Sequence, residues 1–315
     1  MNKEGTLDDS SPVAVVGAGA VGTALARRLA EQGMPVQALL SRDRADAQAL
    51  AERVGAPVAS DAWTDLPEAV RVVFLCVPDD ALPDVARALA AVGHPWARTV
   101  VGHTSGARTA AVLAPLADAG AATLSFHPLQ TFTPDTPPDA FADIAIGIEG
   151  DPEAVAAGTV LARTLGARPV ELSARGKALY HCAAALASNG LVALMAVVEE
   201  LLAAADVEGE EASAAALMAP LVEQTWANLR SAAPEGVLTG PVARGDRDTV
   251  AAHLEALREE VPHLLPLYAA LSTEMARVAV RGGQTEAPSA EELLQMLQRA
   301  LQSSSDGTAP SGSSH

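Results

Sequence analysis

A glycine-rich turn directly after a short apolar run constrains the fold of this chain more than any other feature. The run at residues 13–16 predicts a buried strand, and the next six residues have the spacing GxGxxG. Those six are Gly17, Ala18, Gly19, Ala20, Val21 and Gly22. In a strand–turn–helix unit such glycines permit the tight turn, the approach of phosphates and close helix packing, while the helix N-terminus binds the anion. The motif predicts a dinucleotide-binding domain, and the alternative is a glycine-rich turn in another α/β fold.

The end of the second predicted strand, residues 35–40, indicates which dinucleotide binds. Ser41 and Arg42 follow it, and their hydroxyl and guanidinium groups match a 2′-phosphate in hydrogen bonding and charge. An NAD site usually has an acidic residue here instead. We therefore expect NADP(H). Asp43 comes one or two residues late for the ribose role, so NAD stays open, and Arg42 and Arg44 could simply be solvated at a helix start.

Length and charge limit the classes of function. The 315 residues are enough for two domains, and the net charge of −18 opposes binding to nucleic acid or to anionic membrane surfaces. Cys76 and Cys182 lie in segments that look buried, which favours small apolar side chains in a reducing compartment over a disulfide. We expect a small-molecule substrate and neither a nucleic-acid nor a membrane partner.

The start of the chain and its apolar stretches predict a cytoplasmic protein. Residues 1–11 are polar and lack the apolar core of a signal peptide. Residues 183–198 approach membrane length, but Ser188 and Asn189 interrupt them and acidic residues follow. We therefore expect a buried domain helix there.

The first half of the chain alternates between strand and helix patterns. Strands are expected at 13–17, 35–40, 56–59, 70–77, 99–103, 122–126, 143–149 and 167–172. Helices are expected at 21–31, 44–54, 82–92, 108–119 and 152–165. The strands are continuous apolar runs, as in sheets that helices cover on both faces. This pattern predicts an α/β domain with a mostly parallel, doubly wound sheet.

From about Ser173 onward the strand signals disappear. Helices are expected at 174–205, 210–232, 247–260, 264–281 and 290–301. Ser289 and Glu292 have the spacing of a capping box for the last of these. We predict a disordered segment at 1–10, a dinucleotide-binding domain at 11–172, a helical substrate and dimerisation domain at 173–302, and a disordered tail at 303–315.

Polar residues that follow the predicted strands are candidates for the site, because ligands bind beyond the carboxyl ends of an open parallel sheet. Val77 and Pro78 follow the fourth strand and would pass close to the cofactor. His103 ends the fifth strand with Ser105 just after it, and His127 follows the sixth. Two histidines at successive strand ends favour a site, although each alone could be a structural hydrogen-bonding residue.

The first helix of the C-terminal half adds a third cluster. At roughly 100° per residue, Lys177, His181 and Ser188 lie within about 40° of one another, with Asn189 on the flank. A lysine and a histidine one turn apart on an apolar helix are costly to bury without a function. The alternative is a Lys177 exposed in the first turn and a His181 satisfied in the core.

One later loop and one possible metal site complete the candidates. Residues 238–246 lie between helices, where Arg244 could bind a carboxylate and Asp246 is expected to cap the next helix. His103, His127 and His181 could be imagined as zinc ligands, but their spacing matches no metal motif and we expect no metal.

Four segments together resemble a known family. They are GHTSG (102–106), SFHPLQTF (125–132), KALYHCAAALASN (177–189) and LTGPVARGD (238–246). The chain resembles, over about residues 11–301, a family of Rossmann-like proteins assigned as oxidoreductases. The C-terminal half of that family is a domain of unknown function related to the helical domain of 6-phosphogluconate dehydrogenase. The resemblance implies an N-terminal doubly wound Rossmann domain followed by an all-α domain of that type.

More distant relatives imply roles for single residues. In β-hydroxyacid dehydrogenases and ketopantoate reductases, a lysine on the first helix after the Rossmann domain donates a proton, and an asparagine follows four residues later. Lys177 is similar in place, but His181 stands where the asparagine would be, so either could be the proton donor. His127-Pro128 resembles a histidine–proline pair of prephenate dehydrogenases. Such relatives form dimers through the helical domain, which implies a homodimer.

These observations predict an NADP(H)-dependent oxidoreductase that transfers hydride to or from a small carbonyl or hydroxy acid, with a ketopantoate-like substrate suggested by the relatives. The candidate catalytic residues are Lys177, His181, His127 and His103, and the candidate substrate-binding residues are Ser105, Ser188, Asn189 and Arg244. Two alternatives stay open: a non-catalytic dinucleotide-binding sensor or scaffold, and an imine reductase on the same architecture.

Overall fold

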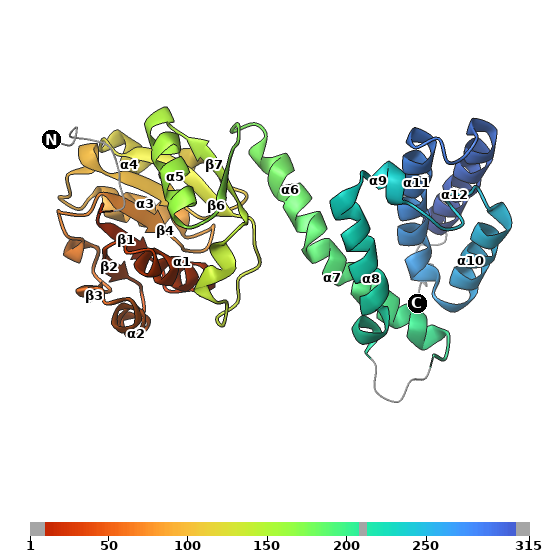
Figure 1. The fold of residues 1–315 in the computed structure, drawn as a ribbon, viewed down its shortest axis with the longest axis horizontal. Coiled ribbons are helices and arrows are strands. Elements are labelled where there is room, and N and C mark those ends of the chain that lie inside the picture. The colour runs from red at the N-terminus through yellow and green to blue at the C-terminus, as the bar shows by residue number, and fades with distance from the viewer. Residues whose placement is uncertain (1–9, 208–212, 307–315) are drawn as a thin grey trace, which may run out of the picture. The chain divides into compact units, whose positions relative to one another are not determined.

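The computed structural model describes residues 10–207 and 213–306. The chain divides into two compact units, residues 1–188 and 189–315 (Figure 1). The disorder predicted for residues 1–10 and 303–315 falls mainly outside the described ranges, as do residues 210–212 of one predicted helix. The last helix continues to Asp306, which is five residues beyond its predicted end.

The first unit is built on one eight-stranded sheet, and all eight predicted strands are present. In chain order they are β1 (Val13–Val16), β2 (Val36–Leu40), β3 (Val58–Ser60), β4 (Val72–Leu75), β5 (Val100–His103), β6 (Ala122–Pro128), β7 (Ala145–Gly150) and β8 (Arg168–Glu171). Their order in the sheet is β3-β2-β1-β4-β5-β6-β7-β8, and every pair is parallel except β6 with β7. The predicted α/β class with a mostly parallel sheet is confirmed.

Helices cover both faces of this sheet. They are α1 (Ala20–Glu31), α2 (Arg44–Val54), α3 (Leu82–Ala90), α4 (Ala114–Asp118) and α5 (Pro152–Thr164), and the first unit ends with α6 (Lys177–Ala187). Val13 and Val15 point into a core with α1, α2 and α5, whereas Ala14 and Val16 point into a core with α3 and α4. Alternate residues of one strand therefore fill two cores, which explains the continuous apolar runs in the sequence.

Two boundaries in the first unit differ from the prediction for local reasons. Strand β6 continues through His127 to Pro128, because the antiparallel partner β7 pairs with both residues. His127 therefore lies within the strand rather than in the loop after it. The helix predicted at 108–119 divides into a 3-10 turn (Ala110–Leu113) and α4, where Pro115 occupies a first-turn position that suits proline.

The second unit is entirely helical in its described residues. Its helices are α7 (Asn189–Ala204), α8 (Ala214–Ser231), α9 (Pro234–Val237), α10 (Arg247–Glu260), α11 (Leu265–Arg281) and α12 (Ala287–Asp306). Leu254, Leu265 and Leu297 join α10, α11 and α12 in one apolar core. The capping box predicted at Ser289 is wrong, because α12 begins two residues earlier and Glu292 pairs instead with Arg247 at 2.5 Å.

The buried helix predicted at 183–198 is not buried within this chain. The sequence that was expected to form one helix forms α6 and α7, which are interrupted at Ser188. Residues Lys177–Ala204 have the length and composition of a membrane-crossing helix. No residue of the most apolar 18-residue segment in this stretch is buried. Cys182 is likewise exposed, contrary to the prediction, because no described residue of this chain covers that face of α6.

Candidate active site

The glycine turn after β1 has the geometry of a phosphate cradle. Gly17 has a φ of +104°, and a Cβ there would lie 2.3 Å from the carbonyl oxygen of Cys76. A Cβ at Gly22 would lie 2.0 Å from the carbonyl oxygen of Gly17. Neither position tolerates a side chain, because backbone atoms occupy the space. A Cβ at Gly19 would meet nothing within 4 Å, so the space in front of the turn is open.

The N-terminus of α1 faces this open space without a side-chain cap. The helix begins at Ala20, Gly19 is its N-cap, and its first turn contains no acidic residue. The first backbone N–H groups of a helix have no partner within the helix and carry a partial positive charge. The turn therefore fits a diphosphate, as the motif predicted.

A pocket of about 770 Å³ lies beside the cradle and is lined by most of the predicted cofactor residues. It is lined by Gly17, Ala18, Gly19, Ser41, Arg42, Asp43, Arg44, Asp46, Trp63, Cys76, Val77, Pro78, Ala81 and Val85. This volume is within the usual range for small-molecule and cofactor sites. The structure thus brings the ends of β1, β2 and β4 to one cavity, while Ala20, Val21 and Gly22 form the adjoining first turn of α1.

The carboxylate of Asp43 caps a helix and does not take the role of binding a ribose. Its Oδ1 accepts hydrogen bonds from the backbone N–H groups of Ala45 at 2.8 Å and Asp46 at 3.4 Å, so it caps α2. Ser41 and Arg42 are then the first polar side chains after β2 that can face a ligand in this pocket.

Lys177 begins α6 and is completely buried, so the alternative of an exposed first-turn lysine is wrong. Its Nζ donates a hydrogen bond to Ser125 Oγ at 2.5 Å. Burial lowers its pKa to about 8, against the opposing effect of the Glu149 and Asp79 carboxylates. The chain has only one other lysine, Lys3, and otherwise uses arginine for positive charge. That rarity is a sequence signal for Lys177 that the motif search did not use.

A row of buried polar side chains crosses three strands next to Lys177. His103 on β5 is the register partner of Ser125 on β6, and Ser125 is the partner of Glu149 on β7. Paired residues point to the same sheet face, and all three are less than 9% exposed. Sequence reasoning missed Ser125 and Glu149. A carboxylate within an otherwise apolar strand was the available signal for Glu149.

His103 and Ser105, two of the predicted site residues, hold the loop after β5. His103 Nε2 lies 3.1 Å from the Thr109 carbonyl oxygen, and its Nδ1 accepts a hydrogen bond from the Ser105 N–H at 3.2 Å. This places the ring proton on Nε2. Burial lowers the pKa of His103 to about 4, so the ring is neutral at pH 7. Ser105 Oγ accepts hydrogen bonds from the backbone of Ala107 and Arg108.

The other two predicted histidines lie together against a glycine. The rings of His127 and His181 meet edge to face, with centroids 5.8 Å apart. A Cβ on Gly106 would lie 2.3 Å from His181 Nδ1 and 2.8 Å from His127 Nε2, so a side chain at this position would displace the two rings. Burial, followed by the charge of Lys177, lowers the pKa of His127 to about 4. Tyr180, which the sequence search missed, packs its ring edge to face with His127 at 5.7 Å.

The remaining predicted residues lie apart from this cluster or in the other unit. Ser188 is exposed, and its Oγ lies 3.3 Å from Thr131 Oγ1. Asn189 and Arg244 belong to the second unit and are exposed. Asp246 caps α10 as predicted, accepting a hydrogen bond from the Thr249 N–H at 3.1 Å. Among the described residues, no group of three or more His, Cys, Asp or Glu could hold a metal ion.

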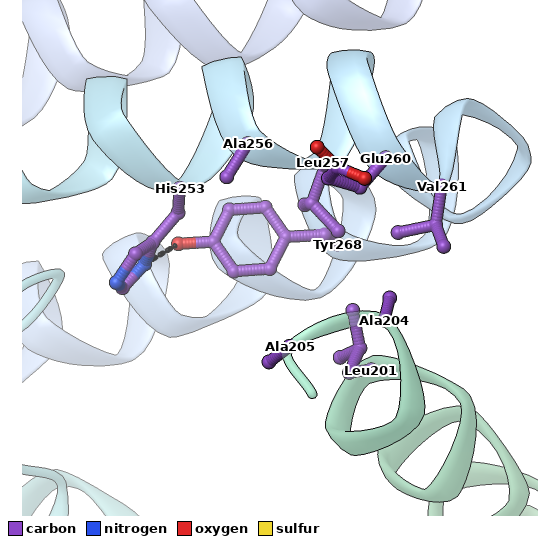
Figure 2. Close-up of a pocket in the computed structure, with 9 residues that line it drawn as sticks. All are labelled: Leu201, Ala204, Ala205, His253, Ala256, Leu257, Glu260, Val261 and Tyr268. Atoms are coloured by element: carbon purple, nitrogen blue, oxygen red, sulfur yellow. Dashed lines mark hydrogen bonds between the residues drawn. The ribbon is translucent and has the colours of Figure 1, made fainter. Parts of the chain in front are cut away.

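The second unit contains a separate pocket of about 460 Å³, shown in Figure 2. It is lined by Leu201, Ala204, Ala205, His253, Ala256, Leu257, Glu260, Val261 and Tyr268. His253 Nδ1 and the Tyr268 hydroxyl are 2.7 Å apart and use each other as hydrogen-bond partners. The pocket is mostly apolar and includes no predicted site residue, so the candidate chemistry lies in the first unit.

Two family models match the sequence. Residues 4–128 match the model of a Rossmann-like domain, and residues 144–275 match a domain of unknown function, DUF2520. The fold and the glycine cradle therefore define a Rossmann-like architecture. The chain joins a Rossmann-like domain to a DUF2520 domain, which confirms the family resemblance. No curated protein matches the sequence.

Several solved structures share this fold. A Bacteroides fragilis protein provisionally named an NADP oxidoreductase is 24% identical, covers 85% of this chain and 98% of its own, and has a TM-score of 0.67. The protein TM1727 of Thermotoga maritima is 23% identical, with a TM-score of 0.61, and the match covers 92% of this chain and 98% of TM1727. An imine reductase of a Pseudomonas species is 18% identical, with coverages of 93% and 94% and a TM-score of 0.56. At these identities the likeness establishes the fold, an N-terminal α/β domain followed by a helical domain.

Replacing Lys177 with an apolar side chain of similar length should stabilise the protein at neutral pH. The folded pKa of about 8 lies below the ordinary value of 10.5, so the folded state resists protonation and the penalty is complete below pH 8. We expect Lys177→Met to raise the free energy of unfolding at pH 7 by about 1–3 kcal/mol. The advantage should shrink as the pH rises from 8 to 10. Urea denaturation at several pH values measures both effects, and a variant less stable than the wild type at pH 7 would contradict this account.

Proposed function

We propose that this protein is an NADP(H)-dependent oxidoreductase that transfers hydride between its cofactor and a small substrate with a C=O or C=N bond. The observation that carries the proposal is a fully buried lysine with a pKa of about 8 in the same unit as an open glycine cradle. Perturbed pKa values of this kind concentrate at catalytic sites. The shared fold with proteins named as an NADP oxidoreductase and as an imine reductase supports the same class.

The first unit supplies the residues that would hold the cofactor. Residues 17–22 would bind the diphosphate through backbone N–H groups, and Ser41 and Arg42 would bind the 2′-phosphate. Val77 and Pro78 would line the path toward the nicotinamide. NADP(H), when bound, supplies or accepts the hydride and leaves the accompanying proton to the protein.

Lys177 is the proposed proton donor. Below its pKa of about 8 the amine is an ammonium, and it can donate a proton from Nζ to the substrate oxygen or nitrogen as negative charge develops there. The neutral amine that remains suits a buried position, so the same group can accept a proton in the reverse direction. His181 is the alternative donor and lies one turn further along α6.

The other predicted catalytic histidines have different proposed roles. His127 has a pKa of about 4 and is neutral at pH 7, so it would orient a substrate through hydrogen bonds rather than donate a proton as an imidazolium. His103 has both ring nitrogens engaged by the backbone and would keep the loop after β5 in place.

Two substrate classes fit this chemistry. A ketopantoate-like 2-oxo acid carries a carboxylate, for which Arg244 remains the partner predicted from the sequence. Ser188 and Asn189 remain the residues predicted from the sequence to form hydrogen bonds with the substrate. An imine is favoured by the fold shared with the Pseudomonas imine reductase. A dinucleotide-binding sensor needs the cradle but no proton donor, so the buried lysine argues against it.

Removing the proposed 2′-phosphate contacts should weaken NADPH binding selectively. Charge-assisted hydrogen bonds of this kind contribute about 1.5–3 kcal/mol each, so Arg42→Ala should weaken NADPH binding by about 10- to 100-fold and leave NADH binding almost unchanged. Isothermal titration calorimetry measures both affinities. Arg53→Ala is a matched control, because Arg53 lies on α2 away from this pocket. Equal losses for both coenzymes would indicate an NAD site.

Removing the amine should abolish turnover without affecting the cofactor. We expect Lys177→Ala to bind NADPH normally and to lose about 10²- to 10⁴-fold in kcat toward the best substrate in a panel of 2-oxo acids and cyclic imines. Reduction by the wild type should slow as the pH rises above about 8, where the amine loses its proton. The decrease in NADPH absorbance measures the loss in kcat and the dependence of the rate on pH. Surviving activity would remove Lys177 from its role, and binding without oxidation across the whole panel would favour the sensor.

The second unit is the proposed site of homodimerisation. α7 and α8 contact each other and leave Val192, Leu221 and Trp226 more than 60% exposed. Apolar exposure on this scale marks an interaction surface. We propose a second copy rather than a bilayer as the cover, because Lys177 at one end of the apolar stretch is buried and Ser188 and Asn189 interrupt it. This proposal agrees with the cytoplasmic homodimer predicted from the sequence.

A charge placed on this surface should separate the dimer. We expect the wild type to elute as a dimer in size-exclusion chromatography with light scattering, and Leu221→Glu to elute as a monomer at the same concentration. Ala252→Glu, on an exposed position of α10, is the matched control and should stay dimeric. A monomeric wild type, or one that partitions into detergent or lipid, would refute the proposal.

A further inference from the structure

The ammonium of Lys177 is the end of a chain of hydrogen bonds across neighbouring elements. Lys177 Nζ donates to Ser125 Oγ at 2.5 Å, and Ser125 Oγ donates in turn to the Ser105 carbonyl oxygen at 3.5 Å. The Ser105 N–H donates to His103 Nδ1 at 3.2 Å. Ser125 and Lys177 are completely buried. With Lys177 protonated, the direction of each bond is fixed, because an ammonium can only donate and the Ser105 carbonyl can only accept.

Glu149 stands beside this chain and is not in contact with the ammonium. It is the cross-strand partner of Ser125, is only 8% exposed, and its Oε2 accepts a hydrogen bond from the Ala110 N–H at 2.8 Å. No ion pair within 4 Å joins it to Lys177 in the described structure, yet its negative charge favours the charged form of that lysine. Asp79, after β4, also favours the charged form of Lys177, and the charge of Lys177 lowers the pKa values of His103 on β5 and His127 on β6. Tyr180 and His181 lie about one turn further along α6.

The separation of the Lys177 ammonium from the Glu149 carboxylate is unusual for a buried pair of charges that only stabilises the fold. A buried ammonium and a buried carboxylate are costly to desolvate, and direct contact is the arrangement that offsets the cost best. Here a serine hydroxyl takes the place next to the ammonium instead. A direct ion pair would hold the proton tightly, whereas a more distant carboxylate supports the charge and leaves the proton transferable. Arginine, which this chain uses almost everywhere else, cannot release a proton at all.

We propose that Ser125 and Glu149 are positioning residues for Lys177. Ser125 directs the ammonium, and the charge of Glu149 keeps that group protonated at neutral pH. The use of the proton in reduction rests on the proposed function, but the control of the lysine's charge can be measured without cofactor or substrate.

The low lysine content makes that measurement direct. Full-length protein labelled with ¹³C at the lysine ε carbon gives two side-chain signals, from Lys3 and Lys177, and Lys3→Arg assigns them. We expect the NMR titration midpoint of Lys177 to fall by about 1 pH unit in Glu149→Gln, which keeps an acceptor for the Ala110 N–H but removes the charge. Glu171→Gln, on exposed β8, should leave the midpoint unchanged. An unchanged midpoint in Glu149→Gln would overturn the role of Glu149.

Ser125 is tested by the loss and return of its hydroxyl. Ser125→Ala should also lower the midpoint and reduce kcat more than it raises KM, while Ser125→Thr should restore both, because the ammonium again has its acceptor. A Ser125→Ala variant with the wild-type midpoint would overturn its role. If the midpoints move as expected but no substrate is ever reduced, the proposed function fails while the positioning of Lys177 stands.

Discussion

The burial of one ammonium group is the constraint on which the candidate site depends. Lys177 has no exposed surface, so its hydrogen bonds and its compensating charges must come from the protein itself. Ser125 provides an acceptor at 2.5 Å, and the carboxylates of Glu149 and Asp79 favour the positive charge. Asp79 lies after β4, Ser125 lies in the middle of β6 and Glu149 lies on β7, where it pairs with Ser125. The lysine keeps a pKa of about 8 because the compensation is incomplete, and that value suits a group that gives and regains a proton near neutral pH.

The glycine cradle depends on close packing rather than on charge. Gly17 and Gly22 lie where any side chain would collide with backbone atoms, so the turn between β1 and α1 is compressed against the segment after β4. This compression leaves the N-terminus of α1 facing open space in front of Gly19. Parallel strands end at the same edge of the sheet, so the cradle and the polar ends of β4 and β5 share one edge. The topology therefore brings the proposed cofactor site and the polar ends of β4 and β5 to one edge of the sheet.

Local patterns predicted the elements well and their pairings poorly. All eight strands were predictable from apolar runs, and the bounds of α10 agree residue for residue. The antiparallel pairing of β7 with β6, which draws His127 into the strand, depends on a partner about 20 residues away and has no local signal. Ser125 was missed because a serine is ordinary in its strand, and Glu149, although unusual in an apolar strand, becomes its neighbour only through the register. The exposure of α7 was not predictable either, because the apolar pattern of a helix does not show whether its own domain covers it.

We infer that the glycine cradle and Lys177 serve one reaction. A crystal structure with bound NADPH tests it most directly through the distance between the hydride-donating carbon of the nicotinamide and Lys177 Nζ. We predict that this distance is about 5–7 Å. Such a distance leaves room for one C=O or C=N bond, with its carbon near the hydride and its oxygen or nitrogen within hydrogen-bond reach of Nζ. The inference would be wrong if the nicotinamide pointed away from Lys177. It would also be wrong if the distance were beyond about 10 Å in both protomers of a dimer.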